Sequence, residues 1–114
     1  MAPHKGLTLH ALDTAGGKPA AGLGYTVFRI DGDTRTALAS GKTNDDGRCE
    51  APMLTGGALT AGVYEVLFDV AAWRGDGTGF YDLVPIRFKV RDAGQHYHIP
   101  LLISPFGYTT YRGS

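Results

Sequence analysis

The sequence predicts an all-β fold, an antiparallel β-sandwich of seven or eight short strands. Apolar and polar residues alternate with a period of two in several segments, as they do in strands with one buried face. Turn-forming residues, among them 17 glycines and six prolines, separate these segments. Only residues 71–74 could form a helical turn, and so short a segment does not make a stable helix alone. Many short strands with almost no helix are typical of sandwiches.

The first half of the chain begins with a clear strand, in which Leu7, Leu9 and Ala11 alternate with residues of the opposite face. Aspartate and glycine runs at 13–17, 31–33 and 43–47 are turns or loops by composition. The strands expected here cover residues 7–12, 24–30, 36–42 and, less clearly, 48–51.

The second half contains the cleanest half-buried pattern, in which Ile86, Phe88 and Val90 alternate with basic residues. Tyr97, Ile99, Leu101 and Ile103 define another strand in the same way. The strands expected in this half cover residues 64–70, 86–90, 97–103 and 108–111, with a hairpin connection at 104–107.

Length and composition limit the possible functions. The 114 residues fit one domain, 1–114, and eleven basic residues balance eleven acidic ones. No basic cluster suggests a nucleic-acid partner, and no apolar stretch approaches the length of a membrane span or a signal peptide. Cys49 is the only cysteine, so no intrachain disulfide forms. We therefore expect a cytoplasmic location, without nucleic-acid or membrane partners.

Two histidines are the first candidates for a site. If Tyr97 and Ile99 face the core, then His98 faces outward, and the same reasoning on the first strand turns His10 outward. A histidine on an exposed strand is usually a surface residue, and we interpret His4 that way. Two on one face could activate water, because imidazoles titrate near neutral pH. Such a face requires a covering, for which a second subunit is the natural candidate.

The sequence gives weaker support to other kinds of catalytic site. His96 and His98 lie two residues apart on one strand face, which suits zinc, but no third ligand accompanies them at the usual spacing. We expect no metal and no cofactor. Cys49 could be a nucleophile, although a lone cysteine is more often a small buried residue. Arg48 and Arg112 could hold a carbonyl or an oxyanion beside the histidines, or could simply be solvated.

The motifs at both ends of the chain and in its middle resemble those of one family. Residues 96–114, which end in Tyr-Arg-Gly-Ser, look like the C-terminal signature of the 5-hydroxyisourate hydrolases, transthyretin-like proteins. Residues 7–13 are similar to the N-terminal motif of that family, and residues 43–48 to its central motif. Ala11 stands where valine is common, and Phe106 where tryptophan is common; both residues stay apolar.

The resemblance implies a transthyretin-like sandwich of two four-stranded sheets with one short helix, assembled as a homotetramer, a dimer of dimers. It implies hydrolysis of 5-hydroxyisourate to 2-oxo-4-hydroxy-4-carboxy-5-ureidoimidazoline in urate breakdown, with the site between facing sheets of different subunits. By position, the catalytic residues would be His10, Arg48 and His98. The substrate-binding residues would be Tyr111, Arg112, Gly113 and Ser114. Which histidine is the general base stays open.

Two other functions compete with hydrolysis. A non-catalytic carrier of small ligands, of the transthyretin type, would share the fold and the tetramer but should lack the histidine pair and the terminal motif. A structural β-sandwich module of a surface protein would explain the turn at residues 43–47 but not the C-terminal motif. Since the fold is common to all three functions, only the site residues can decide among them.

Overall fold

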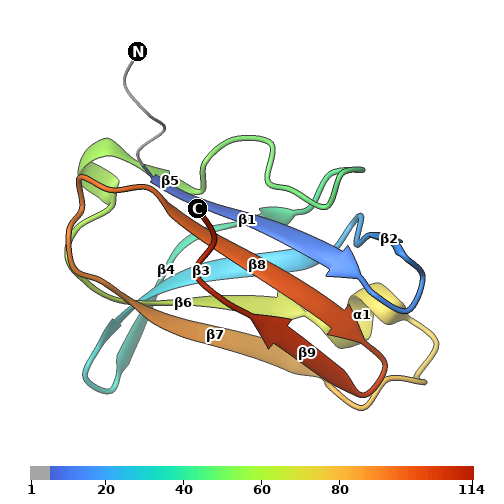
Figure 1. Ribbon diagram of the computed structural model, residues 1–114. Helices are drawn as coiled ribbons and strands as arrows, with labels where there is room; N and C mark the ends of the chain where they lie inside the picture. Colours follow the sequence, from blue (N-terminus) through green and yellow to red (C-terminus); the bar gives the residue numbers. More distant parts are fainter. Residues whose placement is uncertain (1–5) are drawn as a thin grey trace.

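The computed structural model describes residues 6–114 as two β-sheets packed face to face (Figure 1). One sheet has the strand order β2-β1-β8-β9, with β5 also paired to β1, and the other has the order β4-β3-β6-β7. The strands are β1 (Gly6–Asp13), β2 (Lys18–Pro19), β3 (Gly24–Asp31), β4 (Thr34–Lys42), β5 (Leu54–Thr55), β6 (Gly62–Asp69), β7 (Leu83–Val90), β8 (Tyr97–Ser104) and β9 (Gly107–Thr110). The helical segments are η1 (Gly56–Ala58) and α1 (Val70–Arg74).

The predicted sandwich is confirmed, and the sequence placed most of its strands. All strand pairs are antiparallel except β1 and β8, which run parallel with Thr8 opposite His98 and His10 opposite Pro100. The short strand expected at residues 48–51 is wrong, because Arg48 makes only an isolated bridge to His10. The pairing in that region comes later, in β5. The two-residue strands β2 and β5 are too short to show a period in the sequence.

The core lies between the sheets and contains the alternating residues that the sequence marked. Leu7, Leu9 and Ala11 of β1 are buried, as are Tyr97, Ile99 and Leu101 of β8. Thr8, His10 and His98 are half-buried on the opposite, outer face. The predicted phase of both strands is therefore confirmed, and it places the two histidines outside the sandwich.

The end of β6 shows where the sequence was less accurate. Val70 was expected in the strand but begins α1, because the Asp69 carboxylate accepts a hydrogen bond from Ala72 N and caps the helix. Gly75 ends it in the left-handed region, at φ 72°. Neither helical segment of residues 6–114 has the length and apolar character that crossing a membrane requires.

Candidate active site

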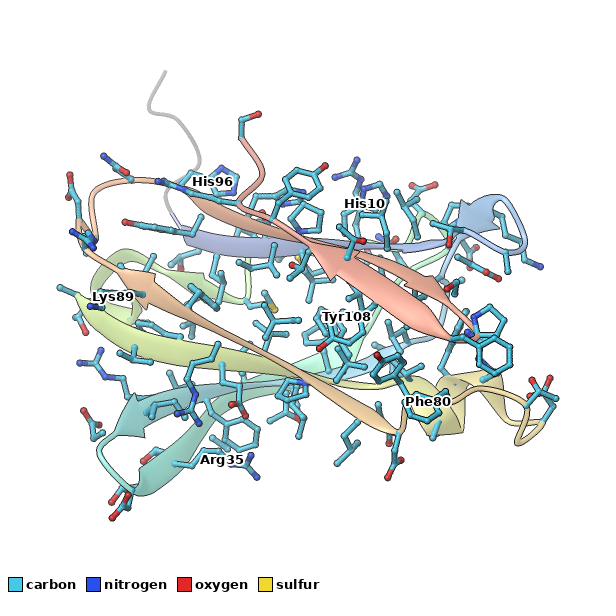
Figure 2. All side chains as sticks on the ribbon, turned by 60° about the horizontal axis from the view of Figure 1, so that its bottom comes forward. His10, Arg35, Phe80, Lys89, His96 and Tyr108 are labelled. Atoms are coloured by element: carbon cyan, nitrogen blue, oxygen red, sulfur yellow. The ribbon has the colours of Figure 1, made fainter. Side chains whose placement is uncertain are left out.

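The outer face of the β1–β8 pair carries the histidines. Thr8 and His98 are direct partners in the parallel register, and His10 lies two residues further along β1 on the same face. Figure 2 shows His10 and His96 on the side of this sheet that faces away from the other sheet. The backbone pairing of the two strands thus gathers imidazoles from both ends of the chain onto one surface.

Arg48 joins this surface through the loop that precedes it. The Asn44 side-chain oxygen accepts hydrogen bonds from Asp46 N (2.9 Å) and Arg48 N (3.0 Å). Gly47 closes the turn at φ 75°, and a β-carbon there would lie 2.3 Å from the Ala11 carbonyl oxygen. The turn brings Arg48 into an antiparallel bridge with His10, so the two side chains share the outer face.

A cavity of about 280 Å³ opens on this face. Arg48, His98 and Ser114 contribute its polar groups, together with His96 and Thr8. The only cysteine, Cys49, is a free thiol at its wall. His10 does not line this cavity; it lies beside it, next to Arg48. Among residues 6–114 no three histidine, cysteine or acidic side chains come together as a metal site.

The surroundings of both histidines favour the neutral imidazole. Burial lowers the pKa of His98 below its ordinary value of 6.5, and the positive charges of Arg48, His96 and His10 lower it further. Burial and then the charge of Arg48 also lower the pKa of His10, against a hydrogen bond to the Asp46 carbonyl that raises it. Neutral imidazoles at physiological pH are able to accept a proton from water.

The His10 ring is also held in one orientation. Its Nε2 lies 3.1 Å from the Asp46 carbonyl oxygen, which can only accept a hydrogen bond. Nε2 therefore carries the proton and donates it, and in the neutral ring the lone pair is on Nδ1.

The C-terminal segment continues the edge of the same sheet. Leu101 pairs with Thr110 at the end of the β8–β9 ladder, and beyond it Gly113 forms an isolated bridge with His98 in the same register. Gly113 N donates to the His98 carbonyl oxygen at 2.8 Å. Ser114 then reaches the cavity. Of the four predicted terminal residues, Gly113 thus lies against His98, and Ser114 lines the same cavity as His98.

The other two terminal residues behave differently. Arg112 turns toward the opening between the sheets, where its guanidinium carbon lies 4.5 Å from the centre of the Tyr97 ring. It also donates to Gln95 Oε1 (3.0 Å) and to the His96 carbonyl oxygen (3.2 Å). Tyr111 is exposed and shares the face of Gly113 by alternation. The structure does not place Arg112 or Tyr111 among the residues that line the cavity.

Sequence reasoning missed the residues that support this site. It treated Asn44 and Gly47 as loop composition, although they orient Arg48. It gave Thr8 no role and considered His96 only as part of a possible zinc pair with His98, although both Thr8 and His96 line the cavity. The outward phase of β1 was the one signal that could have drawn attention to Thr8, which stands on the same face as His10.

Comparison with known proteins identifies relatives of this chain. The chain is 54% identical to the 5-hydroxyisourate hydrolase of Mesorhizobium japonicum, over 95% of this chain and 91% of that one. The solved 5-hydroxyisourate hydrolase of Klebsiella pneumoniae superposes with a TM-score of 0.81 at 34% identity, covering 95% and 97% of the two chains.

A transthyretin is similar in structure as well. Sea bream transthyretin, solved in complex with thyroxine, superposes with a TM-score of 0.86 at 32% identity, over 94% of this chain and 93% of that one. The sequence model of the HIUase/Transthyretin family matches residues 7–113. This match covers nearly the whole sequence, so the chain belongs to the HIUase/Transthyretin family.

Proposed function

We propose that this protein hydrolyses 5-hydroxyisourate at the outer-face cavity of the β1–β8 sheet. The observation that carries the proposal is the meeting of His98, Arg48 and Ser114 in one cavity, with His10 beside Arg48. We infer the substrate from the relatives that are named 5-hydroxyisourate hydrolase. The product is 2-oxo-4-hydroxy-4-carboxy-5-ureidoimidazoline, and the reaction is a step of urate breakdown.

In the proposed reaction a histidine acts as general base. It takes a proton from water, and the hydroxide adds to a ring carbonyl carbon of the substrate. Arg48 stabilises the oxyanion that forms, because a guanidinium offers several donors in a fixed fork. The ring C–N bond then breaks, the carbonyl becomes the carboxylate of the product, and the departing nitrogen receives a proton. The mechanism uses no metal and no cofactor.

The terminal motif completes the proposed site. Ser114 lines the cavity and offers a hydroxyl to the substrate or to water. Gly113 leaves room for the His98 ring, and Tyr111 presents its side chain on the same outer face. Arg112 supports the motif from the other side, since its hydrogen bonds hold the segment against residues 95 and 96. In this proposal the segment 111–114 forms the substrate-binding motif, in which Ser114 contacts the substrate and Arg112 holds the segment in place.

We further propose that the domain, residues 1–114, works as a homotetramer, a dimer of dimers, in the cytoplasm. Within residues 6–114, β9 and β7 each form an edge of their sheet without a further partner strand, and such edges invite pairing with another chain. The outer face of β1 and β8 presents its cavity to solvent in the single chain, and a second subunit would close it. Sedimentation of a fully active monomer at assay concentration would contradict the tetramer.

The decisive assay follows the ultraviolet absorbance of freshly generated 5-hydroxyisourate. The wild-type protein should accelerate its decay, and Arg48→Lys should lose most of the acceleration because an ammonium group keeps the charge but not the fork. Arg35→Lys is the matched control, since Arg35 pairs with Glu65 on the opposite sheet and should leave turnover unchanged. Equal losses in both variants would remove Arg48 from the site.

A further inference from the structure

The Thr8 hydroxyl lies between two imidazoles. Its Oγ1 is 2.8 Å from His98 Nδ1 and 2.8 Å from His96 Nε2. The centres of the two rings are 6.2 Å apart, so the hydroxyl bridges a gap that the rings do not close by themselves. All three side chains are half-buried and line the same cavity.

Counting protons limits what these two contacts can be. A hydroxyl carries one hydrogen, so Thr8 can donate to only one of the two rings and must accept from the other if both contacts are hydrogen bonds. In one arrangement His98 Nδ1–H donates to Thr8, and Thr8 donates to His96 Nε2. In the other the direction is reversed, and His98 then carries its proton on Nε2.

The cavity favours the first arrangement. Since Nδ1 of His98 faces Thr8, Nε2 is the ring nitrogen left for a water molecule or the substrate. Arg48 lines the same cavity, and its guanidinium has donors only. A cation near the ring favours a lone pair on the free nitrogen over a second N–H. The first arrangement leaves that lone pair on Nε2, where a general base needs it.

We propose that Thr8 and His96 are positioning residues, which hold His98 in the Nδ1–H tautomer so that its Nε2 is the general base of the reaction. This inference rests on the proposed function and deepens it. The role of His96 is to accept the Thr8 proton, which fixes the direction of both hydrogen bonds. His10 differs, because its Nε2–H is already committed to the Asp46 carbonyl.

A purely structural role for Thr8, fastening β1 to β8, predicts other results. The strands already pair along seven residues, so loss of one side-chain bond should hardly change their packing. In the proposed relay, the chain of hydrogen bonds from His98 through Thr8 to His96, loss of the hydroxyl frees the His98 ring to exchange tautomers and to rotate. The structural role and the positioning role of Thr8 therefore predict different turnover and different protonation of His98, but the same fold.

The kinetic test uses three threonine substitutions. Thr8→Val should lower kcat by roughly tenfold or more with a smaller effect on KM, the scale on which a partner that orients a histidine acts. Thr8→Ser keeps the hydroxyl and should restore most of the turnover. Thr26→Val on β3 is the matched control, since Thr26 is also half-buried on a strand, but on the other sheet, away from the cavity. Its kcat should equal that of the wild type.

The second readout is the tautomer itself, from long-range ¹H–¹⁵N spectra of the histidine rings at a pH where His98 is neutral. The chain has four histidines, so the signals can be assigned with single substitutions. The wild-type protein should show His98 protonated on Nδ1 and bare on Nε2, and Thr8→Val should show a mixture. A wild-type His98 protonated on Nε2 would overturn the relay, as would a Thr8→Val variant with unchanged turnover and tautomer.

The two proposals can fail separately. If the wild-type protein does not accelerate the decay of 5-hydroxyisourate, the proposed function fails, while the tautomer of His98 still decides whether the relay exists. If the wild type is active and Thr8→Val matches it in kcat, the relay fails and the proposed function stands.

Discussion

Gly113 lies directly opposite His98 across the edge of the sheet, and a β-carbon on it would come within 2.5 Å of Cδ2 of the imidazole. The C-terminal glycine thus makes the space in which the His98 ring lies. Pro100 stands on the other side of the same space, at 3.2 Å from that β-carbon position. The position of His98 and the identity of residue 113 are therefore linked.

Gly113→Ala should displace the His98 ring and lower kcat by up to about 100-fold, because catalysis is sensitive to shifts of an ångström. Thermal unfolding should change little, since the residue lies near the chain end. Gly57→Ala is the control, because a β-carbon there meets nothing within 4 Å. Wild-type turnover in Gly113→Ala would show that the ring does not need this space.

His98→Asn and His10→Asn should each reduce turnover by about two orders of magnitude, the usual scale for the loss of an acid–base group. Both side chains lie on the outer face, so the circular dichroism spectrum should stay that of the wild type. A variant with near-normal turnover would remove its histidine from the mechanism. An unfolded variant would show instead that the side chain belongs to the packing.

The pH dependence of kcat/KM should have an acidic limb below pH 6.5, because burial lowers the pKa of His98 and of His10 in the folded chain, and kcat/KM reports the groups of the free enzyme. The unfolded chain binds protons at these residues at higher pH than the folded chain does. Their contribution to the unfolding free energy is therefore fully present above pH 6.5 and is lost as the pH falls through the folded pKa. His98→Asn should show a weaker loss of melting temperature over that range. An acidic limb above pH 6.5 would contradict the neutral pair.

Deletion of residues 111–114 should abolish hydrolysis and leave a folded protein. The fold loses the Gly113–His98 backbone bond and the two Arg112 bonds, each worth roughly 0.5–1.5 kcal/mol. The cavity loses Ser114 and the support of the segment behind it. The melting temperature and the ultraviolet assay test the two halves of this prediction. Full activity of the shortened chain would mean that the motif is a dispensable tail.

Local pattern was enough to predict the sandwich and the faces of its strands. The period of two in β1 and β8 placed Leu9 and Ile99 in the core and His10 and His98 outside it, because a pleated strand alternates its side chains. The parallel pairing of β1 and β8 could not be predicted in this way. Strand alternation fixes a face but not a partner, and the two strands are far apart in the sequence.

Because strand alternation does not reveal pairing partners, the sequence also predicted the site incompletely. Thr8 meets His96 and His98 only because of the parallel register, which the sequence pattern does not contain. Arg112 and Gly113 were expected to act together, but neighbouring residues in an extended segment face opposite sides. Arg112 consequently contacts Tyr97 between the sheets, while Gly113 contacts His98 on the outer face. The catalytic roles of His10, Arg48 and His98 stay predictions.

The central claim is that this protein opens the 5-hydroxyisourate ring at the cavity that His98 and Arg48 line. The most direct measurement is the initial rate of 5-hydroxyisourate decay, followed by ultraviolet absorbance at increasing protein concentration. The account predicts a rate that rises in proportion to the protein above the spontaneous decay, and a His98→Asn protein that adds almost nothing. Decay at the spontaneous rate at every concentration of the wild-type protein would contradict it.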